Sequence, residues 1–329
     1  MLKTTFELYL EKFENLSVLV IGDLMLDEWN YSEAIRLSPE APIPVSKLQK
    51  VETTLGGAGN VCVNISKLGA HCHFLSVIGH DIYTDNILNK YFKEIRITTN
   101  LLIDSSRKNT IKKRFIVDNQ HILRMDREDT FSIGKDLEEH LCALFKYILP
   151  DYDAVIIEDY NKGLLTPFVI NFIVQESKKQ DKKVFVDPKV KNIDNYRDSY
   201  LFKPNKKEFE NIISASFETI ADVVNIQKQI YDWKNFMHIR NVLLTLGKNG
   251  MVLFRDSELF FTDTNFLKGN VIDVTGAGDI VIALYTLLEI LETPTPDEKL
   301  LLSSLAAQTA ITQRGTSTVD TELMFKFLD

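Results

Sequence analysis

The segment DVTGAGD, residues 273–279, combines two glycines with a carboxylate, and an apolar run over residues 280–291 follows it directly. The run predicts a buried helix that begins at this segment. Gly276 and Gly278 allow backbone N–H groups to approach a ligand closely, and the start of a helix adds unpaired donors and a partial positive charge. These properties suit a phosphoryl group in transfer.

Asp279 closes this segment and is a candidate general base, because a sugar hydroxyl that attacks a γ-phosphate must lose its proton. We expect the helix end to lower the pKa of this carboxyl group. The alternative is that Asp and Gly only cap the helix. Other glycine-rich phosphate motifs are excluded: GxxxxGKS/T does not occur, and no glycine pair of the chain is completed to GxGxxG.

Composition narrows the class of protein. The 329 residues suffice for one large α/β domain, 45% of them are hydrophobic, and a net charge of −8 argues against binding nucleic acid. The three cysteines form no CxxC pair, which is typical of a reducing compartment. No signal-peptide pattern begins the chain, and apolar runs of about ten residues are shorter than the roughly 20 that cross a membrane. We expect a soluble, cytoplasmic protein with no membrane partner.

Short apolar runs alternate with segments of helical spacing along the chain, which predicts an α/β fold with a mainly parallel sheet and helices on both faces. Helices are expected at residues 56–70 and 82–95. The predicted buried strands are residues 17–23, 72–79, 153–159, 183–187 and 241–247.

Two stretches interrupt the alternation. Residues 27–53 contain three prolines and no helical period, and residues 110–125 are typical of a hairpin with its turn at 118–120. Both are predicted to form a small β-rich lid inserted in a single domain of residues 1–329. The lid could pair between subunits, so we expect a homodimer.

Four motifs, in their order along the chain, resemble those of the ribokinase-like (PfkB) carbohydrate kinases. They are GGAGN at 56–60, KPNKKE at 203–208, LLTLGKNG at 243–250 and DVTGAGD at 273–279. The resemblance implies the three-layer ribokinase-like fold, the cofactors ATP and Mg²⁺, and a monovalent cation near Asp273 and Thr275. It also implies that GGAGN lies against the sugar and that DVTGAGD supplies the anion hole and the catalytic aspartate.

Further motifs resemble one subfamily, the kinases of D-glycero-β-D-manno-heptose 7-phosphate, which act at O1 in ADP-heptose and lipopolysaccharide core synthesis. They are GDLMLDEW at 22–29, RLSPEAPIPV at 36–45, EDYNKG at 158–163, VDPK at 186–189 and GTSTV at 315–319. The chain has no HxGH motif, so by resemblance it lacks a nucleotidyltransferase domain and would stop at heptose 1,7-bisphosphate. Gly59 and Ile280 depart from the subfamily pattern, which commonly has alanine and threonine. Kinases of other sugars, and a non-catalytic sugar-phosphate-binding regulator, remain as alternatives.

The resemblance assigns roles on the acceptor side. The N–H groups of Gly276, Ala277 and Gly278 would hold the transferring phosphate while Asp279 takes the proton. Residues expected to contact the sugar are Asp23, Asp27, Gly56, Gly57 and Asn60. Carboxylates there would accept hydrogen bonds from vicinal hydroxyls, although Asp23 could equally end a strand and Asp27 could be solvated.

A phosphorylated acceptor also needs basic contacts. Lys112 and Arg114 alternate to one face of a predicted strand within the densest basic run and, with Lys189, are candidates for the 7-phosphate or for ATP charge. The alternative is that this run guards a strand edge. Asp187 ends a strand, where α/β folds place ligands, and is expected to contact substrate hydroxyls or metal-bound water.

The nucleotide is expected to lie along a third group of residues: Asn205, Lys206, Lys207, Glu208, Thr245, Gly247 and Gly250. Glu208 could reach Mg²⁺ through water, and it could also form a capping box with Asn205 at a helix start; the two roles are compatible. The aromatic side chains of Phe115, Tyr160 and Phe202 are interpreted as core, and the histidines of HCH (71–73) as structural rather than metal-binding.

Overall fold

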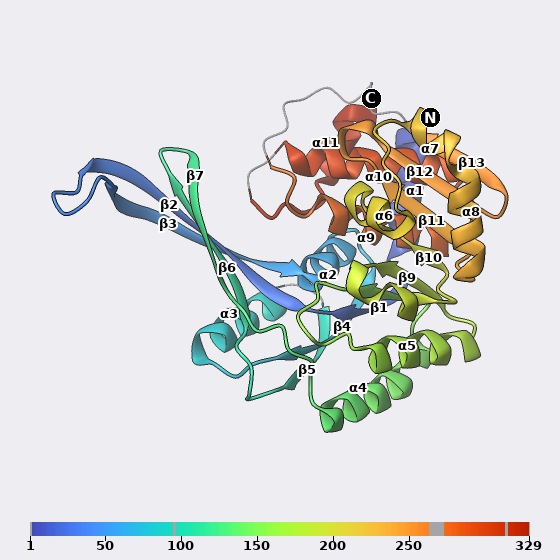
Figure 1. The fold of residues 1–329 in the computed structure, drawn as a ribbon, viewed down its shortest axis with the longest axis horizontal. Coiled ribbons are helices and arrows are strands. Elements are labelled where there is room, and N and C mark those ends of the chain that lie inside the picture. The colour runs from blue at the N-terminus through green and yellow to red at the C-terminus, as the bar shows by residue number, and fades with distance from the viewer. Residues whose placement is uncertain (1, 95–96, 263–272, 313–314, 329) are drawn as a thin grey trace.

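The computed structural model describes residues 2–94, 97–262, 273–312 and 315–328. Its centre is a sheet in the order β13-β12-β11-β10-β9-β8-β1-β4-β5 (Figure 1), in which β12 and β13 pair antiparallel and the rest pair parallel. The strands are β1 (Ser17–Gly22), β4 (His71–Ile78), β5 (Ile97–Ile103), β8 (Ala154–Glu158), β9 (Lys183–Asp187), β10 (Leu201–Phe202), β11 (Asn241–Thr245), β12 (Met251–Arg255) and β13 (Glu258–Thr262). All five strands predicted from apolar runs are confirmed.

Helices cover both faces of this sheet, as predicted for strands that are apolar throughout. In β1, Val18 and Val20 face one hydrophobic core while Leu19 and Ile21 face the other. Helices α1 (Leu2–Phe13), α2 (Ala58–Lys67), α9 (Ala277–Ile290), α10 (Pro296–Ile311) and α11 (Thr321–Leu328) contribute to the first core. Helices α4 (Lys135–Ile148), α5 (Pro167–Lys179), α6 (Lys206–Ile213) and α8 (Gln227–Phe236) contribute to the second. The remaining α-helices are α3 (Ile82–Glu94) and α7 (Ile220–Asn225).

A second sheet, which we call the lid, projects from the main body in the order β3-β2-β6-β7 (Figure 1). It consists of β2 (Leu24–Leu37), β3 (Pro44–Gly57), β6 (Thr110–Val117) and β7 (Gln120–Arg127). The hairpin turn lies at Asp118 and Asn119, both with positive φ, as the sequence predicts for this position. β2 and β3 are longer than the interval 27–53 predicted for the first lid segment, because β2 continues directly from the end of β1 and β3 runs into α2.

None of the helices in the described part of the chain is both long and apolar enough to span a bilayer. Helix α9 is apolar all around because it packs against both α2 and α10 as well as the sheet.

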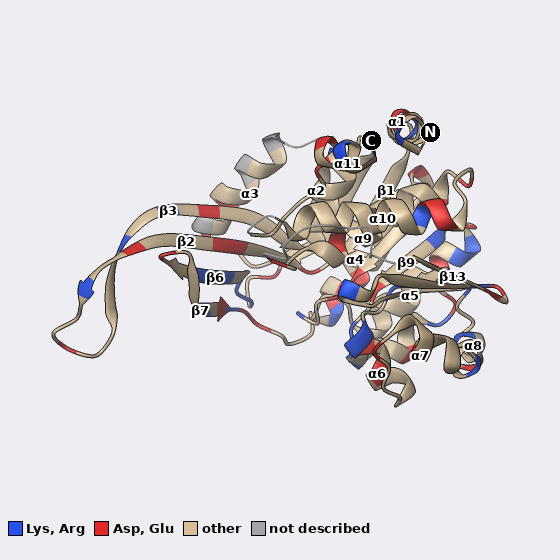
Figure 2. Cartoon of the chain, turned by 90° about the horizontal axis from the view of Figure 1, so that it is seen from above, with Lys and Arg blue, Asp and Glu red and all other residues tan. Residues whose placement is uncertain are grey.

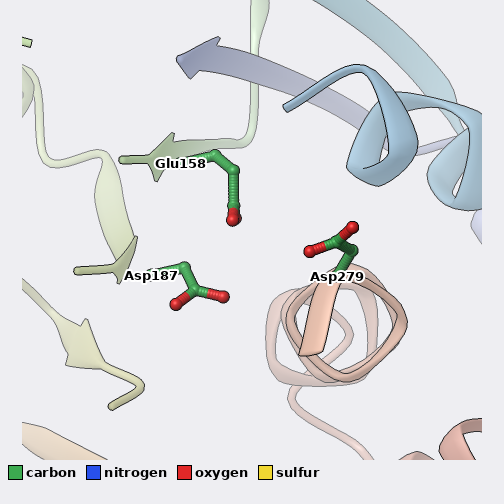
Figure 3. A group of neighbouring side chains, drawn as sticks. All are labelled: Glu158, Asp187 and Asp279. Atoms are coloured by element: carbon green, nitrogen blue, oxygen red, sulfur yellow. The ribbon is translucent and has the colours of Figure 1, made fainter. Parts of the chain in front are cut away.

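This topology sets the location of the site. Strands β1, β8 and β9 are parallel neighbours, so the residues that follow them all emerge at one edge of the sheet. The start of α9 lies at the same edge (Figure 3), and the inner ends of β2 and β3 enter it from the lid.

Candidate active site

Three buried carboxylates converge at this edge. Glu158 ends β8, Asp187 ends β9, and Asp279 lies in the first turn of α9; Figure 3 shows their side chains directed into one shared space. One oxygen from each lies within 4.8 Å of the others. Acidic groups so close and so buried repel one another, so the site needs a proton, a cation or a donor to stabilise it.

Lys203 supplies part of that compensation. Its ammonium group lies 2.6 Å from Asp187 Oδ2 and is almost fully buried. Burial raises the pKa of Glu158 well above its usual value, and the charges of Asp187 and Asp279 act in the same direction. Glu158 Oε2 is buried and has no hydrogen-bond partner among the described residues. Carboxylate oxygens are the ligands that Mg²⁺ prefers, so this group fits a divalent cation.

Both carboxylate oxygens of Asp279 accept a hydrogen bond. The Asn60 amide donates to Oδ2 at 2.7 Å, and the Tyr160 hydroxyl donates to Oδ1 at 2.9 Å. Burial raises the pKa of Asp279 to about 6, and repulsion from Asp187 adds to it. The expectation that the helix end would lower this pKa is therefore wrong, because burial outweighs the helix. A carboxylate with this pKa is ionised at neutral pH and is still able to take a proton.

The helix start has the geometry that the glycines predict. Gly276 is the N-cap with φ of 85°, and a Cβ atom there would lie 2.8 Å from the Asn60 amide nitrogen. The helix begins at Ala277, within the segment where the sequence predicts its start. The Ala277 N–H donates to the Val274 carbonyl at 3.3 Å, so it is partly engaged within the turn.

The two aspartates expected to bind the sugar are both held by the protein. Asp23 accepts N–H groups of the loop after β8, from Tyr160 and Lys162 at 3.0 Å each. Burial, together with Asp159, raises the pKa of Asp23 to about 6. Asp23 therefore orders the loop that carries Tyr160.

Asp27 pairs with Arg114 at 2.5 Å and accepts the Thr316 hydroxyl at 2.8 Å, so it ties the lid to the main body. Gly56 and Gly57 lie close to both aspartates. A Cβ at Gly56 would come within 2.4 Å of Asp27 Oδ2, and one at Gly57 within 2.7 Å of the Asp23 carbonyl oxygen.

The three candidate basic residues separate into two environments. Arg114 is buried inside the lid, where its guanidinium lies 4.6 Å from the Trp29 ring as well as against Asp27. Lys112 and Lys189 instead reach Tyr160, at 5.4 and 5.2 Å from the ring centroid. The structure therefore brings Lys112 and Lys189 together at the Tyr160 ring and places Arg114 apart from them.

The nucleotide-side candidates gather at the ends of β10 and β11. The capping box is confirmed: Asn205 and Glu208 exchange backbone-to-side-chain hydrogen bonds of 2.9 Å, and Asn205 bridges Thr245. Glu208 also accepts from Lys189 at 2.7 Å, so both of its oxygens have partners.

The other members of this group lie around that pair. Gly247 and Gly250 form a turn with positive φ after β11. Lys206 pairs with Glu218 at 2.5 Å, and Lys207 is exposed.

Sequence reasoning missed three residues of this site: Glu158, Tyr160 and Lys203. The signal was present, since Glu158 and Tyr160 lie in EDYNKG directly after a buried strand and Lys203 begins KPNKKE. Tyr160 was interpreted as core, but its hydroxyl contacts Asp279. Phe202 is fully buried, as expected, and His73 is bound to Tyr152 and Asn100 in a structural role.

The arrangement defines a class of protein: an α/β enzyme that presents a buried carboxylate beside a helix start at the carboxyl edge of its sheet, covered by a β lid. Residues 15–322 match the pfkB family carbohydrate kinase profile, and the chain belongs to this family. The protein is therefore a kinase that uses ATP and a divalent metal to phosphorylate a carbohydrate.

Curated relatives match most of the chain. The Bifunctional protein HldE of Bradyrhizobium sp. (strain ORS 278) is 35% identical over 95% of this chain and 63% of the relative, and that of Helicobacter acinonychis (strain Sheeba) is 33% identical over 93% and 65%. The chain thus spans just under two thirds of these relatives.

Solved structures match the fold. Phosphofructokinase-2 from Escherichia coli in complex with potassium superposes with a TM-score of 0.75 at 16% identity, over 95% of this chain and 97% of that one. Arabidopsis thaliana ribokinase complexed with ribose and ATP gives 0.68 at 17% identity, over 95% and 98%. The ribokinase-like fold expected from the sequence is confirmed.

Proposed function

We propose that the protein transfers the γ-phosphate of ATP to O1 of D-glycero-β-D-manno-heptose 7-phosphate and so makes heptose 1,7-bisphosphate for ADP-heptose and lipopolysaccharide core synthesis. The observation that carries the proposal is Asp279, a buried carboxylate at a helix start whose two oxygens are oriented by Asn60 and Tyr160. The HldE relatives, at 33–38% identity, support the heptose as acceptor.

In the proposed reaction, the anomeric hydroxyl donates its proton to Asp279 as the oxygen attacks phosphorus, and the phosphate–ADP bond breaks in line. The amides at Gly276, Ala277 and Gly278 would hold the transferring group and stabilise its charge. The Lys203 ammonium group, 2.6 Å from Asp187 Oδ2, offsets the charge of this carboxylate beside the reacting atoms.

The metal and nucleotide sites follow from the charges. Glu158 and Asp187 would hold Mg²⁺, with Glu208 reaching it through water. Bound Mg²⁺ would neutralise charge on the phosphate oxygens. The turn at Gly247 and Gly250 would border the nucleotide. A monovalent cation would lie near Asp273, whose carboxylate already accepts from the Thr275 N–H at 2.9 Å.

We also propose that residues 1–329 act as one kinase domain in the cytoplasm and assemble as a homodimer through the lid. Support for the assembly comes from apolar side chains on the lid and on the loop between β2 and β3, which are about half exposed or more. They are Ile35, Leu37, Ile43, Leu48, Ile122, Leu123 and Met125. Exposed apolar patches of this kind mark contact surfaces in soluble proteins.

A panel of acceptors tests the catalytic proposal. Purified protein is incubated with Mg-ATP and, separately, heptose 7-phosphate, fructose 6-phosphate, fructose and ribose, and products are identified by mass spectrometry with ADP release measured in parallel. Heptose 1,7-bisphosphate is expected as the main product. A clear preference for fructose or ribose would replace the acceptor, and tight acceptor binding without ADP release would indicate a non-catalytic regulator.

A further inference from the structure

Tyr160 connects the lid to the base. Its hydroxyl donates to Asp279 Oδ1 at 2.9 Å, and the ammonium group of Lys112, on lid strand β6, lies 5.4 Å from the centroid of its ring. One aromatic ring and one hydrogen bond therefore separate a cation of the lid from the proton acceptor of the main body. The loop that carries Tyr160 is fixed by Asp23, so this spacing does not depend on the lid alone.

Lys112 differs from the other cationic side chains of the two lid strands β6 and β7. Each of the others lies within 4.0 Å of a carboxylate: Lys113 with Glu28, Arg114 with Asp27, Arg124 with Asp126 and Arg127 with Asp81. Lys112 has no such partner among the residues that the structure describes. Figure 2 shows the basic segment on β6 beside the acidic segments of β2.

The surroundings of Lys112 make this lack of a partner costly. The side chain is partly buried, and burial lowers its pKa; the charges of Lys162 and Arg124 act in the same direction, while those of Asp27 and Asp126 oppose them. A partly buried cation without an ion pair is stabilised when an anion binds to it. Phosphate oxygens are suitable partners because they accept charge-assisted hydrogen bonds.

A glycine packs against the Tyr160 ring. Gly57, in the glycine-rich segment at the end of β3, has φ of 57°, and a Cβ atom there would lie 3.3 Å from Tyr160 Cδ2. Lys189 approaches the ring at 5.2 Å and is itself bound to Glu208 on the nucleotide side. The ring therefore lies between the nucleotide end of the site and the lid.

We propose that Tyr160 is a positioning residue that selects acceptors by length: the sugar lies along its ring, the attacking hydroxyl reaches Asp279, and an anionic group at the opposite end of the sugar reaches Lys112. The inference rests on the proposed function for the direction of transfer. It predicts preference for sugars phosphorylated at the end remote from the attacking hydroxyl, because an unphosphorylated acceptor leaves Lys112 without a partner.

Two substitutions test the role of the Lys112 cation and the role of Tyr160 separately. Lys112→Met should lower the ratio of kcat/KM for heptose 7-phosphate over unphosphorylated heptose about 10- to 100-fold, mainly through the KM of the phosphorylated acceptor, since a hydrogen bond to a charged group is lost. Tyr160→Phe keeps the ring and removes the donor, so kcat should fall about 10-fold or more while the acceptor KM changes little. The matched control is Lys113→Met, the adjacent lysine paired with Glu28, which should leave the ratio unchanged.

The outcomes are separable. If Lys112→Met leaves the ratio unchanged, or lowers it no more than Lys113→Met does, the inference is wrong. Lys112→Arg keeps the charge and should therefore retain the preference for the phosphorylated acceptor. This variant is used if the Met variant does not fold. If wild-type protein prefers a different sugar phosphate, the proposed acceptor fails and the ratio is measured with that sugar. If it prefers unphosphorylated sugars, the inference fails and the kinase class stands. If no acceptor reacts, calorimetric affinities for the phosphorylated sugars decide in the same way.

Discussion

The group of buried carboxylates at the carboxyl edge of the main sheet, which we call the floor of the site, contains a buried ion pair, and so does the lid. The buried or partly buried charged groups left outside such pairs are negative on the floor and positive in the lid. On the floor, Lys203 faces Asp187 at 2.6 Å, and Glu158 and Asp279 add further carboxylates beside it. In the lid, Arg114 faces Asp27 at 2.5 Å, and the surplus group is a cation, Lys112. The difference agrees with the two proposals above, in which the carboxylates of the floor would take a proton and a metal ion and Lys112 of the lid would take an anion.

The largest expected effect is at the floor. Asp279→Asn keeps the size of the side chain and removes the base, so kcat should fall about 10²- to 10⁴-fold while ATP affinity, measured by calorimetry, changes little. Asp297→Asn, the same change on the exposed first turn of α10, is the control and should retain activity. Substantial turnover by the Asp279 variant would remove Asp279 from the role of base.

Lys203→Met tests whether the buried carboxylates of the floor need the lysine charge for stability. Removing one partner of a buried pair should reduce the free energy of unfolding by about 3–5 kcal/mol at neutral pH. Protonation of the carboxylates at low pH removes the unpaired charge, so the loss should shrink as the pH falls. Lys178→Met, at an exposed pair with Asp198, should cost less than about 1 kcal/mol in the same denaturant titration. Equal losses in the two variants would contradict the distinction.

The pH dependence of activity should follow the titration of Asp279 on the floor and not that of a group in the lid. Asp279 must be ionised to accept a proton, and burial raises its pKa to about 6, so kcat/KM should decrease below about pH 6, roughly tenfold per unit. Asn60→Leu removes a hydrogen bond that lowers this pKa, and the decrease should therefore begin at higher pH. A pH–rate profile measured at saturating Mg-ATP, with an unchanged midpoint in the variant, would contradict the assignment.

The smallest effect on folding is expected at the outer half of the lid. Leu37→Lys changes a side chain that is 73% exposed, so the free energy of unfolding should change by less than about 0.5 kcal/mol. If the lid forms the dimer contact, light scattering should nevertheless show a shift towards monomer. Tyr147→Lys, at a position on α4 that is 82% exposed, should leave the assembly unchanged.

Local sequence patterns predicted much of the fold. The apolar runs that became β1, β8 and β9 predicted buried parallel strands, because a strand covered by helices on both faces must be apolar throughout. DVTGAGD predicted a helix start with a reactive carboxylate. In any fold, glycine allows the backbone to approach a ligand closely, and a helix start provides unpaired N–H donors. The sequence also located Asn205 and Glu208 as a capping box, which depends on residues only three apart.

Only the tertiary structure decided which of these groups meet and in what state. The partners of Asp279 lie 219 and 119 residues away in the chain, so no local pattern could show that Asn60 and Tyr160 orient it. The direction of its pKa shift depends on burial, which is a property of the packed protein and which here exceeds the effect of the helix end. The sequence determined the elements and the chemistry they carry; long-range packing determined the distances and the dielectric environment in which that chemistry operates.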